Sequence, residues 1–106
     1  MPVVSLFDVL NPPEPLVLID VRKATARAAS GRTIPDALCR DPLDVAEWGG
    51  AFLGKRVVVF CVHGHEVSQG AAAGLRDLGV EADWLEGGFA AWEEGLNPVV
   101  PIEGAA

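Results

Sequence analysis

The run VVVFCV at positions 57–62 constrains the fold more than any other stretch of this 106-residue chain. Six consecutive apolar residues rich in valine are typical of a short strand that is buried on both faces, as strands of parallel sheets are. The run LVLIDV at 16–21 has the same character, and EADWLE at 81–86 and DALC at 36–39 are weaker strand candidates. These runs predict a mainly parallel sheet of about five strands.

Helical patterns lie between the predicted strands. Apolar residues at every third or fourth position predict a helix over 67–78. Asp44 is a candidate N-cap for a second helix over 45–53, and a short third helix is predicted over 89–95. Strands that alternate with helices predict one α/β domain over 1–106, with helices on both faces of the sheet.

Charge and cysteine content narrow the classes of partner and the compartment. The formal net charge is −7 and no Lys/Arg-rich run occurs, which argues against nucleic acid and anionic membrane as partners. Cys39 and Cys61 are too few for a disulfide framework, and no secretory signal opens the chain, so we expect a cytoplasmic protein with reduced thiols. Cys39 follows an apolar stretch and is expected in the core rather than as a resolving thiol.

Cys61 has the setting of a reactive thiol. It lies at the C-terminal end of a predicted buried strand, directly ahead of a predicted helix. Ligands bind at this edge of open α/β sheets, and the amides and dipole of a helix N-terminus stabilise an anion. Gly64 allows the backbone to curl so that several loop amides converge. We therefore expect a reactive thiolate, and the alternative is an inert apolar residue of the core.

The loop after Cys61 supplies the candidate substrate-binding residues. His63 and His65 could attract an anion or stabilise the thiolate, and they could equally hydrogen-bond loop carbonyls or lie in solvent. Together with Cys61 they present three metal-ligating atoms, but the spacing is not a standard zinc pattern, so no metal or other cofactor is predicted. The loop residues predicted to bind substrate are Val62, His63, Gly64, His65, Glu66 and Val67.

Two charged residues follow the other strong strand candidate. Asp20 is predicted to give structural support by accepting hydrogen bonds that hold neighbouring loops. Arg22 is predicted to pair with a carboxylate at the mouth of the site and is a further candidate for substrate binding.

Four segments, taken in order, resemble the single-domain type of the rhodanese-like (sulfurtransferase) family. They are LVLIDVR, SGRTIPDAL, VVVFCVHGHEVSQGAAAGLRDLGV and DWLEGGFAAWEEGLNPV. The second segment departs from the family pattern at Arg32, Thr33 and Asp36. The resemblance implies a rhodanese-like α/β fold and makes Cys61 the motif cysteine.

The resemblance also implies a reaction, that of a thiosulfate sulfurtransferase. Cys61 would take the outer sulfur of a donor such as thiosulfate, become a persulfide stabilised by loop amides, and pass that sulfur to cyanide or a thiol. A thioredoxin-like protein is a candidate acceptor. The alternative from another class is a non-catalytic interaction or sensor module that has kept the fold and the cysteine.

The length of the loop departs from the common pattern. From Cys61 to Val67 it is one residue longer than in common single-domain sulfurtransferases, and closer to the rhodanese-fold phosphatases and arsenate reductases. Those relatives end the loop with an arginine that binds the oxyanion, whereas Val67 stands there in this chain and no Lys or Arg occurs over 62–75. A phosphoryl or arsenate dianion would lack a guanidinium partner, so that chemistry is disfavoured.

Overall fold

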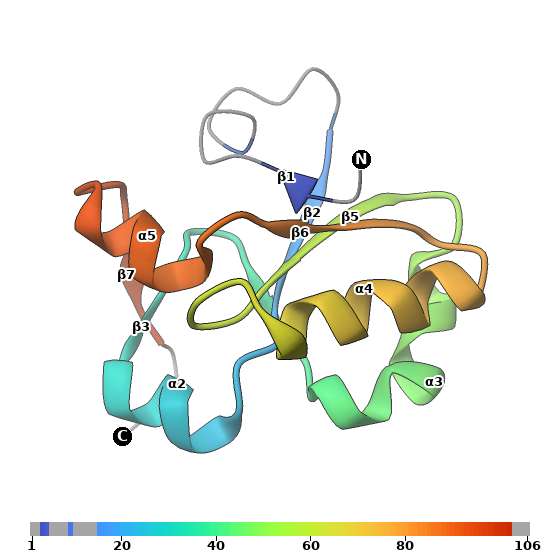
Figure 1. The fold of residues 1–106 in the computed structure, drawn as a ribbon, viewed down its shortest axis with the longest axis horizontal. Helices are drawn as coiled ribbons and strands as arrows, with labels where there is room; N and C mark the ends of the chain where they lie inside the picture. The colour runs from blue at the N-terminus through green and yellow to red at the C-terminus, as the bar shows by residue number, and fades with distance from the viewer. Residues whose placement is uncertain (1–2, 5–8, 10–14, 103–106) are drawn as a thin grey trace.

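A computed structural model describes residues 3–4, 9 and 15–102 of the chain. Its central feature is a five-stranded sheet in which all described strand pairs are parallel (Figure 1). The order across the sheet is β1 (Val3–Val4), β6 (Glu81–Leu85), β5 (Arg56–Phe60), β2 (Val17–Asp20) and β4 (Leu38–Cys39). The predicted α/β class and mainly parallel sheet are confirmed.

Side chains of β5 point alternately to two separate hydrophobic clusters. Val57 and Val59 pack with α3 (Val45–Trp48) and α4 (Glu66–Asp77) on one face of the sheet. Val58 and Phe60 pack on the opposite face with residues of α5 (Gly88–Glu94). Because strand side chains alternate between faces, an uninterrupted apolar run requires a cover on both sides, and helices supply it.

The helical segment that begins near residue 45 differs from the prediction. It is a short α3 followed by the 3₁₀ turn η2 (Gly49–Phe52), and it is preceded by another 3₁₀ turn, η1 (Pro42–Asp44). Asp44 occupies the predicted N-cap position of α3, but its side chain makes no capping hydrogen bond. Asp41 caps instead: its carboxylate accepts a hydrogen bond from the Leu43 N–H at 2.8 Å. Helical geometry starts earlier than expected because proline at the first position favours it.

The strands β1, β3 and β7 and the helix α2 have no counterpart in the prediction. The helix α2 (Ala24–Ser30) contains no buried residue, so it lacks the apolar stripe by which a helix is recognised in sequence. It ends at Gly31, whose φ of 67° is the left-handed conformation common after helices. A second, antiparallel sheet pairs β3 (Arg32–Thr33) with β7 (Val100–Pro101).

Cys39 is not a core residue, so that prediction is wrong. It lies on β4, which is the terminal strand in the sheet order and, among the described strands, pairs with β2 alone. Both residues of β4 are exposed, because the edge strand lacks the cover that the central strands have. In the part of the chain that the structure describes, none of the helices combines the length and the apolar composition needed to span a bilayer.

Candidate active site

Cys61 immediately follows β5 and precedes the loop that enters α4 at Glu66. The predicted arrangement of buried strand, loop and helix around this cysteine is therefore present (Figure 1). The residue is 5% exposed, so its sulfur is reached through a restricted opening rather than across an open surface. The site lies at the carboxyl edge of the parallel sheet, where such sheets bind ligands.

The first turn of α5 holds the start of the loop. The N–H of Phe89 donates to the carbonyl of Cys61 at 2.8 Å, and the N–H of Ala90 donates to the carbonyl of Val62 at 2.8 Å. Gly88 makes this approach possible: its φ is +63°, and a Cβ atom there would lie 2.5 Å from the Cys61 carbonyl oxygen. The helix N–H groups thus turn the two carbonyls toward α5.

Gly64 fixes the middle of the loop in a similar way. Its φ is +75°, and a Cβ atom would lie 2.9 Å from both the Leu85 oxygen and the Gly87 nitrogen. The Gly64 carbonyl accepts a hydrogen bond from the side-chain amide of Gln69 at 3.1 Å. Within the described residues, no N–H of 62–65 donates to a backbone carbonyl. The carbonyls of Cys61, Val62 and Gly64 are thus occupied by α5 and α4, while the N–H groups of 62–65 make no backbone hydrogen bond in this part of the structure.

Ser68 is the polar side chain that contacts the sulfur. Its Oγ lies 3.1 Å from Cys61 Sγ, and the residue is fully buried in the first turn of α4. Once the thiol is ionised, the hydroxyl can donate a hydrogen bond to the sulfur. Ser68 is not among the predicted site residues. The sequence pattern could have indicated Ser68, because it lies on the buried face of α4. The buried residues of this helix are Ser68, Ala71, Ala72 and Leu75.

A cavity of about 450 Å³ opens in front of the cysteine. This volume is within the usual range for small-molecule sites. Gly64, which was predicted to bind substrate, does not line the cavity but packs against Leu85 and Gly87. The loop residues that line it are Cys61, Val62, His63, His65, Glu66 and Val67, and the opposite wall comes from Arg22, Lys23, Thr25 and Ala26.

The Arg22 guanidinium does not lie at the mouth of the site. Its side chain is 1% exposed and forms a fork with Asp20, with Nε 3.0 Å from Oδ1 and Nη2 2.8 Å from Oδ2. Nη2 also donates to the Arg32 carbonyl, and the guanidinium carbon lies 4.3 Å from the centre of the Phe89 ring. Arg22 does pair with a carboxylate as predicted, but the pair is internal.

Asp20 accepts the hydrogen bonds that were predicted for it. Its Oδ1 accepts from the Arg22 N–H at 3.0 Å, and its Oδ2 accepts from the Thr33 hydroxyl at 3.0 Å. The residue is 1% exposed, and these bonds together with the guanidinium occupy its oxygens. The pair joins the end of β2 to β3 and, through Phe89, to α5. It therefore supports the segments around the cavity.

Lys23 supplies the positive charge that the loop lacks. It is exposed, precedes α2 and lines the same cavity as Cys61. It forms no ion pair with any described carboxylate. The sequence of 62–75 does not indicate this lysine, because Lys23 lies outside that segment and directly precedes α2. The sequence pattern does not predict α2, because this helix has no buried residue.

The two histidines and Glu66 lie on the rim. His63 and His65 are exposed, with ring centroids 6.4 Å apart, and both line the cavity. Over residues 3–4, 9 and 15–102, no three His, Cys, Asp or Glu side chains are grouped so that they could hold a metal ion. Glu66 is exposed in the first turn of α4, where a carboxylate complements the helix dipole.

Comparison with known proteins identifies the family. The model of the rhodanese-like domain matches residues 6–95, so the chain belongs to the rhodanese-like domain family. The sequence matches no curated protein at a significant level.

Solved structures share the fold. A rhodanese-related protein from Thermoplasma volcanium is 24% identical, with a TM-score of 0.81 over 94% of this chain and 98% of that one. A full-length protein from Lactobacillus plantarum is 26% identical, with a TM-score of 0.81 over 95% of this chain and 88% of that one. A Rhodopseudomonas palustris protein of unknown function, described as a possible tyrosine phosphatase, is 24% identical, with a TM-score of 0.72 over 80% and 70% of the two chains.

Proposed function

We propose that this domain is a thiosulfate sulfurtransferase-like enzyme that carries sulfane sulfur as a persulfide on Cys61. One arrangement carries the proposal. Cys61 lines a cavity, and its Sγ contacts the buried Ser68 hydroxyl. The N–H groups of the loop that follows Cys61 make no backbone hydrogen bond within the described residues. Membership of the rhodanese-like family supports the same chemistry. We expect the domain to act in the cytoplasm, where thiols stay reduced.

The first half-reaction loads the cysteine. The Cys61 thiolate attacks the outer sulfur of thiosulfate, a new S–S bond forms, and the old S–S bond breaks. Sulfite leaves with the electron pair of that bond, so no external oxidant or reductant is needed. Lys23 attracts the dianionic donor, and the loop N–H groups with the Ser68 hydroxyl stabilise negative charge on sulfur.

The second half-reaction releases the outer sulfur. A thiophilic acceptor, either cyanide or a thiolate, attacks the outer sulfur of the persulfide, and Cys61 leaves as a thiolate. The products are thiocyanate or the persulfide of the acceptor thiol. A thioredoxin-like protein would serve as acceptor through the same attack by its own thiolate.

Phosphatase chemistry has less support from the site. One structural neighbour is described as a possible tyrosine phosphatase, but that 24% identity supports the fold alone. The Arg22 guanidinium is buried against Asp20, and no Lys or Arg occurs in the loop. A phosphoryl dianion in this cavity would meet the exposed ammonium of Lys23 instead of a guanidinium fork.

The test separates an enzyme from an interaction module. Treatment with thiosulfate should add the mass of one sulfur atom to the intact protein, and subsequent cyanide should remove it with release of thiocyanate. Cys61→Ser should abolish both steps, while Cys39→Ser, the matched control, should retain them. A Cys61→Ser protein that still turns over thiosulfate would refute the proposal, and a folded wild-type protein that takes up no sulfur would favour the interaction module.

A further inference from the structure

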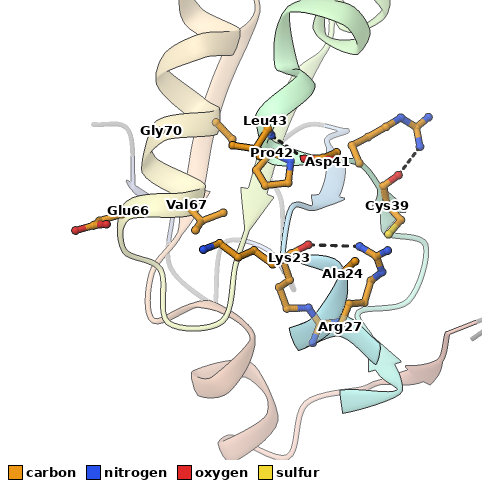
Figure 2. Close-up of a pocket in the computed structure, with 13 residues that line it drawn as sticks. Lys23, Ala24, Arg27, Cys39, Asp41, Pro42, Leu43, Glu66, Val67 and Gly70 are labelled. Carbon is orange, nitrogen blue, oxygen red and sulfur yellow. Dashed lines mark hydrogen bonds between the residues drawn. The ribbon is translucent and has the colours of Figure 1, made fainter. Parts of the chain in front are cut away.

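A second cavity of about 480 Å³ adjoins the cavity of Cys61. The two cavities share Arg22, Lys23, Glu66 and Val67 as lining residues, so a ligand in one can extend into the other. The remaining wall of the second cavity comes from α2, the end of β4, the turn η1 and the first turns of α4 (Figure 2). We call it the basic cavity, defined by Lys23, Arg27, Cys39, Arg40 and Gly70 among its lining residues.

Positive charge gathers in this basic cavity although the chain as a whole is acidic. Four of the eight Lys and Arg residues line it in a protein whose formal net charge is −7. Lys23, Arg27 and Arg40 form no ion pair with any carboxylate of the described residues. The lining residues include more cations than carboxylates, since Asp41 and Glu66 are its acidic members, and an excess of positive charge at a concave site of an acidic chain favours an anionic ligand there.

The two arginines are held in place by the main chain. Arg27 Nη1 donates to the Arg22 carbonyl at 3.4 Å, and Arg40 Nη1 donates to the Cys39 carbonyl at 2.8 Å. Each bond uses one nitrogen of a guanidinium, so other N–H groups remain for a ligand carboxylate.

Two acidic residues, Asp41 and Glu66, also line the cavity, and in the described residues neither forms an ion pair with Lys23, Arg27 or Arg40. The Asp41 carboxylate accepts the N–H of Leu43 at 2.8 Å as the cap of η1. In Figure 2 the Glu66 carboxylate points away from the cavity, while the Lys23 side chain extends toward Val67. Gly70 leaves space, because a Cβ atom there would meet nothing within 4 Å.

We propose that the basic cavity binds the carboxylate end of a small anionic thiol, which is the acceptor of the sulfur carried by Cys61. This inference rests on the proposed sulfur transfer. With its carboxylates on Arg27 and Arg40, the acceptor extends past Lys23 and Val67 into the cavity of Cys61. Its thiolate attacks the outer sulfur, the S–S bond of the persulfide breaks, and Cys61 leaves as a thiolate. The acceptor becomes a persulfide, and the exchange needs no further redox partner.

The test compares two acceptors after loading with thiosulfate: mercaptosuccinate, which has two carboxylates, and neutral 2-mercaptoethanol. Arg40→Gln should lower kcat/KM for mercaptosuccinate about threefold, and the Arg27→Gln/Arg40→Gln double variant about tenfold. The value for 2-mercaptoethanol should change less than twofold. Lys55→Gln, a cation that lines neither cavity, is the matched control and should affect neither acceptor. High salt should narrow the difference between wild type and variants.

A binding measurement separates failure of this inference from failure of the proposed function. In an NMR titration, succinate, which has no thiol, should shift the amide signals of residues 39–41 and 70, and Arg40→Gln should weaken its binding. If every variant keeps the wild-type ratio of kcat/KM for mercaptosuccinate to kcat/KM for 2-mercaptoethanol, the inference is wrong and the proposed function stands. Succinate binding by a protein that takes up no sulfur would overturn the proposed function and the acceptor role together. The single Arg40→Gln variant, at a half-buried position just after the edge strand β4, serves if the double variant does not fold.

Discussion

Replacing Gly88 with alanine should release the active-site loop from α5. Two costs add at this position. An alanine at φ +63° carries the strain of a left-handed backbone, about 1–2 kcal/mol. Its Cβ atom would also lie 2.5 Å from the Cys61 carbonyl oxygen and 2.6 Å from the Gly64 nitrogen, and backbone atoms on both sides must move.

That movement breaks the two hydrogen bonds from the N–H groups of Phe89 and Ala90 to the loop carbonyls. Each such bond contributes about 1 kcal/mol, and more where a partner stays buried without water. The total loss for Gly88→Ala is therefore about 3–5 kcal/mol. This is a large part of the free energy of unfolding of a domain of this size.

Gly31→Ala is the matched control. The φ of Gly31 is +67°, almost the same as that of Gly88, but a Cβ atom there would meet nothing within 4 Å. This variant should lose only the strain of about 1–2 kcal/mol and keep sulfur transfer. The strain is common to both variants, so urea unfolding should give a difference of about 2–3 kcal/mol between them, which is the contribution of the two hydrogen bonds. Thiosulfate:cyanide transfer should fall at least tenfold in Gly88→Ala alone. Equal unfolding energies and equal transfer rates in the two variants would refute the role assigned to Gly88.

Three further predictions concern the groups around the two cysteines. Ser68→Ala should lower the rate of persulfide formation about tenfold without unfolding the domain, since a hydrogen bond to a charged group contributes roughly 1.5–3 kcal/mol. An unchanged rate in stopped-flow would show that the hydroxyl does not stabilise the sulfur. Lys23→Gln should raise the KM for thiosulfate about threefold at low salt and much less at high salt, and a salt-independent effect would argue against an electrostatic role. Cys39 is exposed as a residue, but the protein around its sulfur removes part of the surrounding water, and this desolvation raises the pKa of the thiol and outweighs the lowering by Arg27. In the Cys61→Ser protein, the rate of iodoacetamide alkylation should therefore stay low at neutral pH and rise only above the ordinary cysteine range. Arg27→Gln should move this rise to still higher pH, and a shift to lower pH would contradict the assignment.

The central sheet could be predicted from the sequence because its signal is local. Val57 to Phe60 form one uninterrupted apolar run, and only a strand covered on both faces buries all of it. The same run places Cys61 at the carboxyl edge of the sheet, and the next apolar stripe provides the helix. The position of the candidate site therefore follows from one continuous stretch of chain.

The second wall of the site could not be predicted in this way. The helix α2 buries none of its residues, so its pattern resembles that of a polar loop, and Lys23 at its start was not a candidate. Cys39 has apolar neighbours in sequence but lies on an edge strand, and strand order is not visible in the local pattern. The basic cavity consists of these elements, which explains why its cations appear scattered along the sequence.

Arg22 shows that the residue type at a strand end does not determine whether the side chain points to the ligand site or to the interior. An arginine there could face a ligand or the interior, and the sequence around it is compatible with both. The interior is favoured by partners from three other places in the chain: the carboxylate of Asp20, the carbonyl of Arg32 and the ring of Phe89. Phe89 belongs to the same turn of α5 whose N–H group holds the Cys61 carbonyl. The turn that orients the loop thus also keeps the Arg22 guanidinium paired with Asp20, so of the two cationic residues that line both cavities Lys23 is the exposed one.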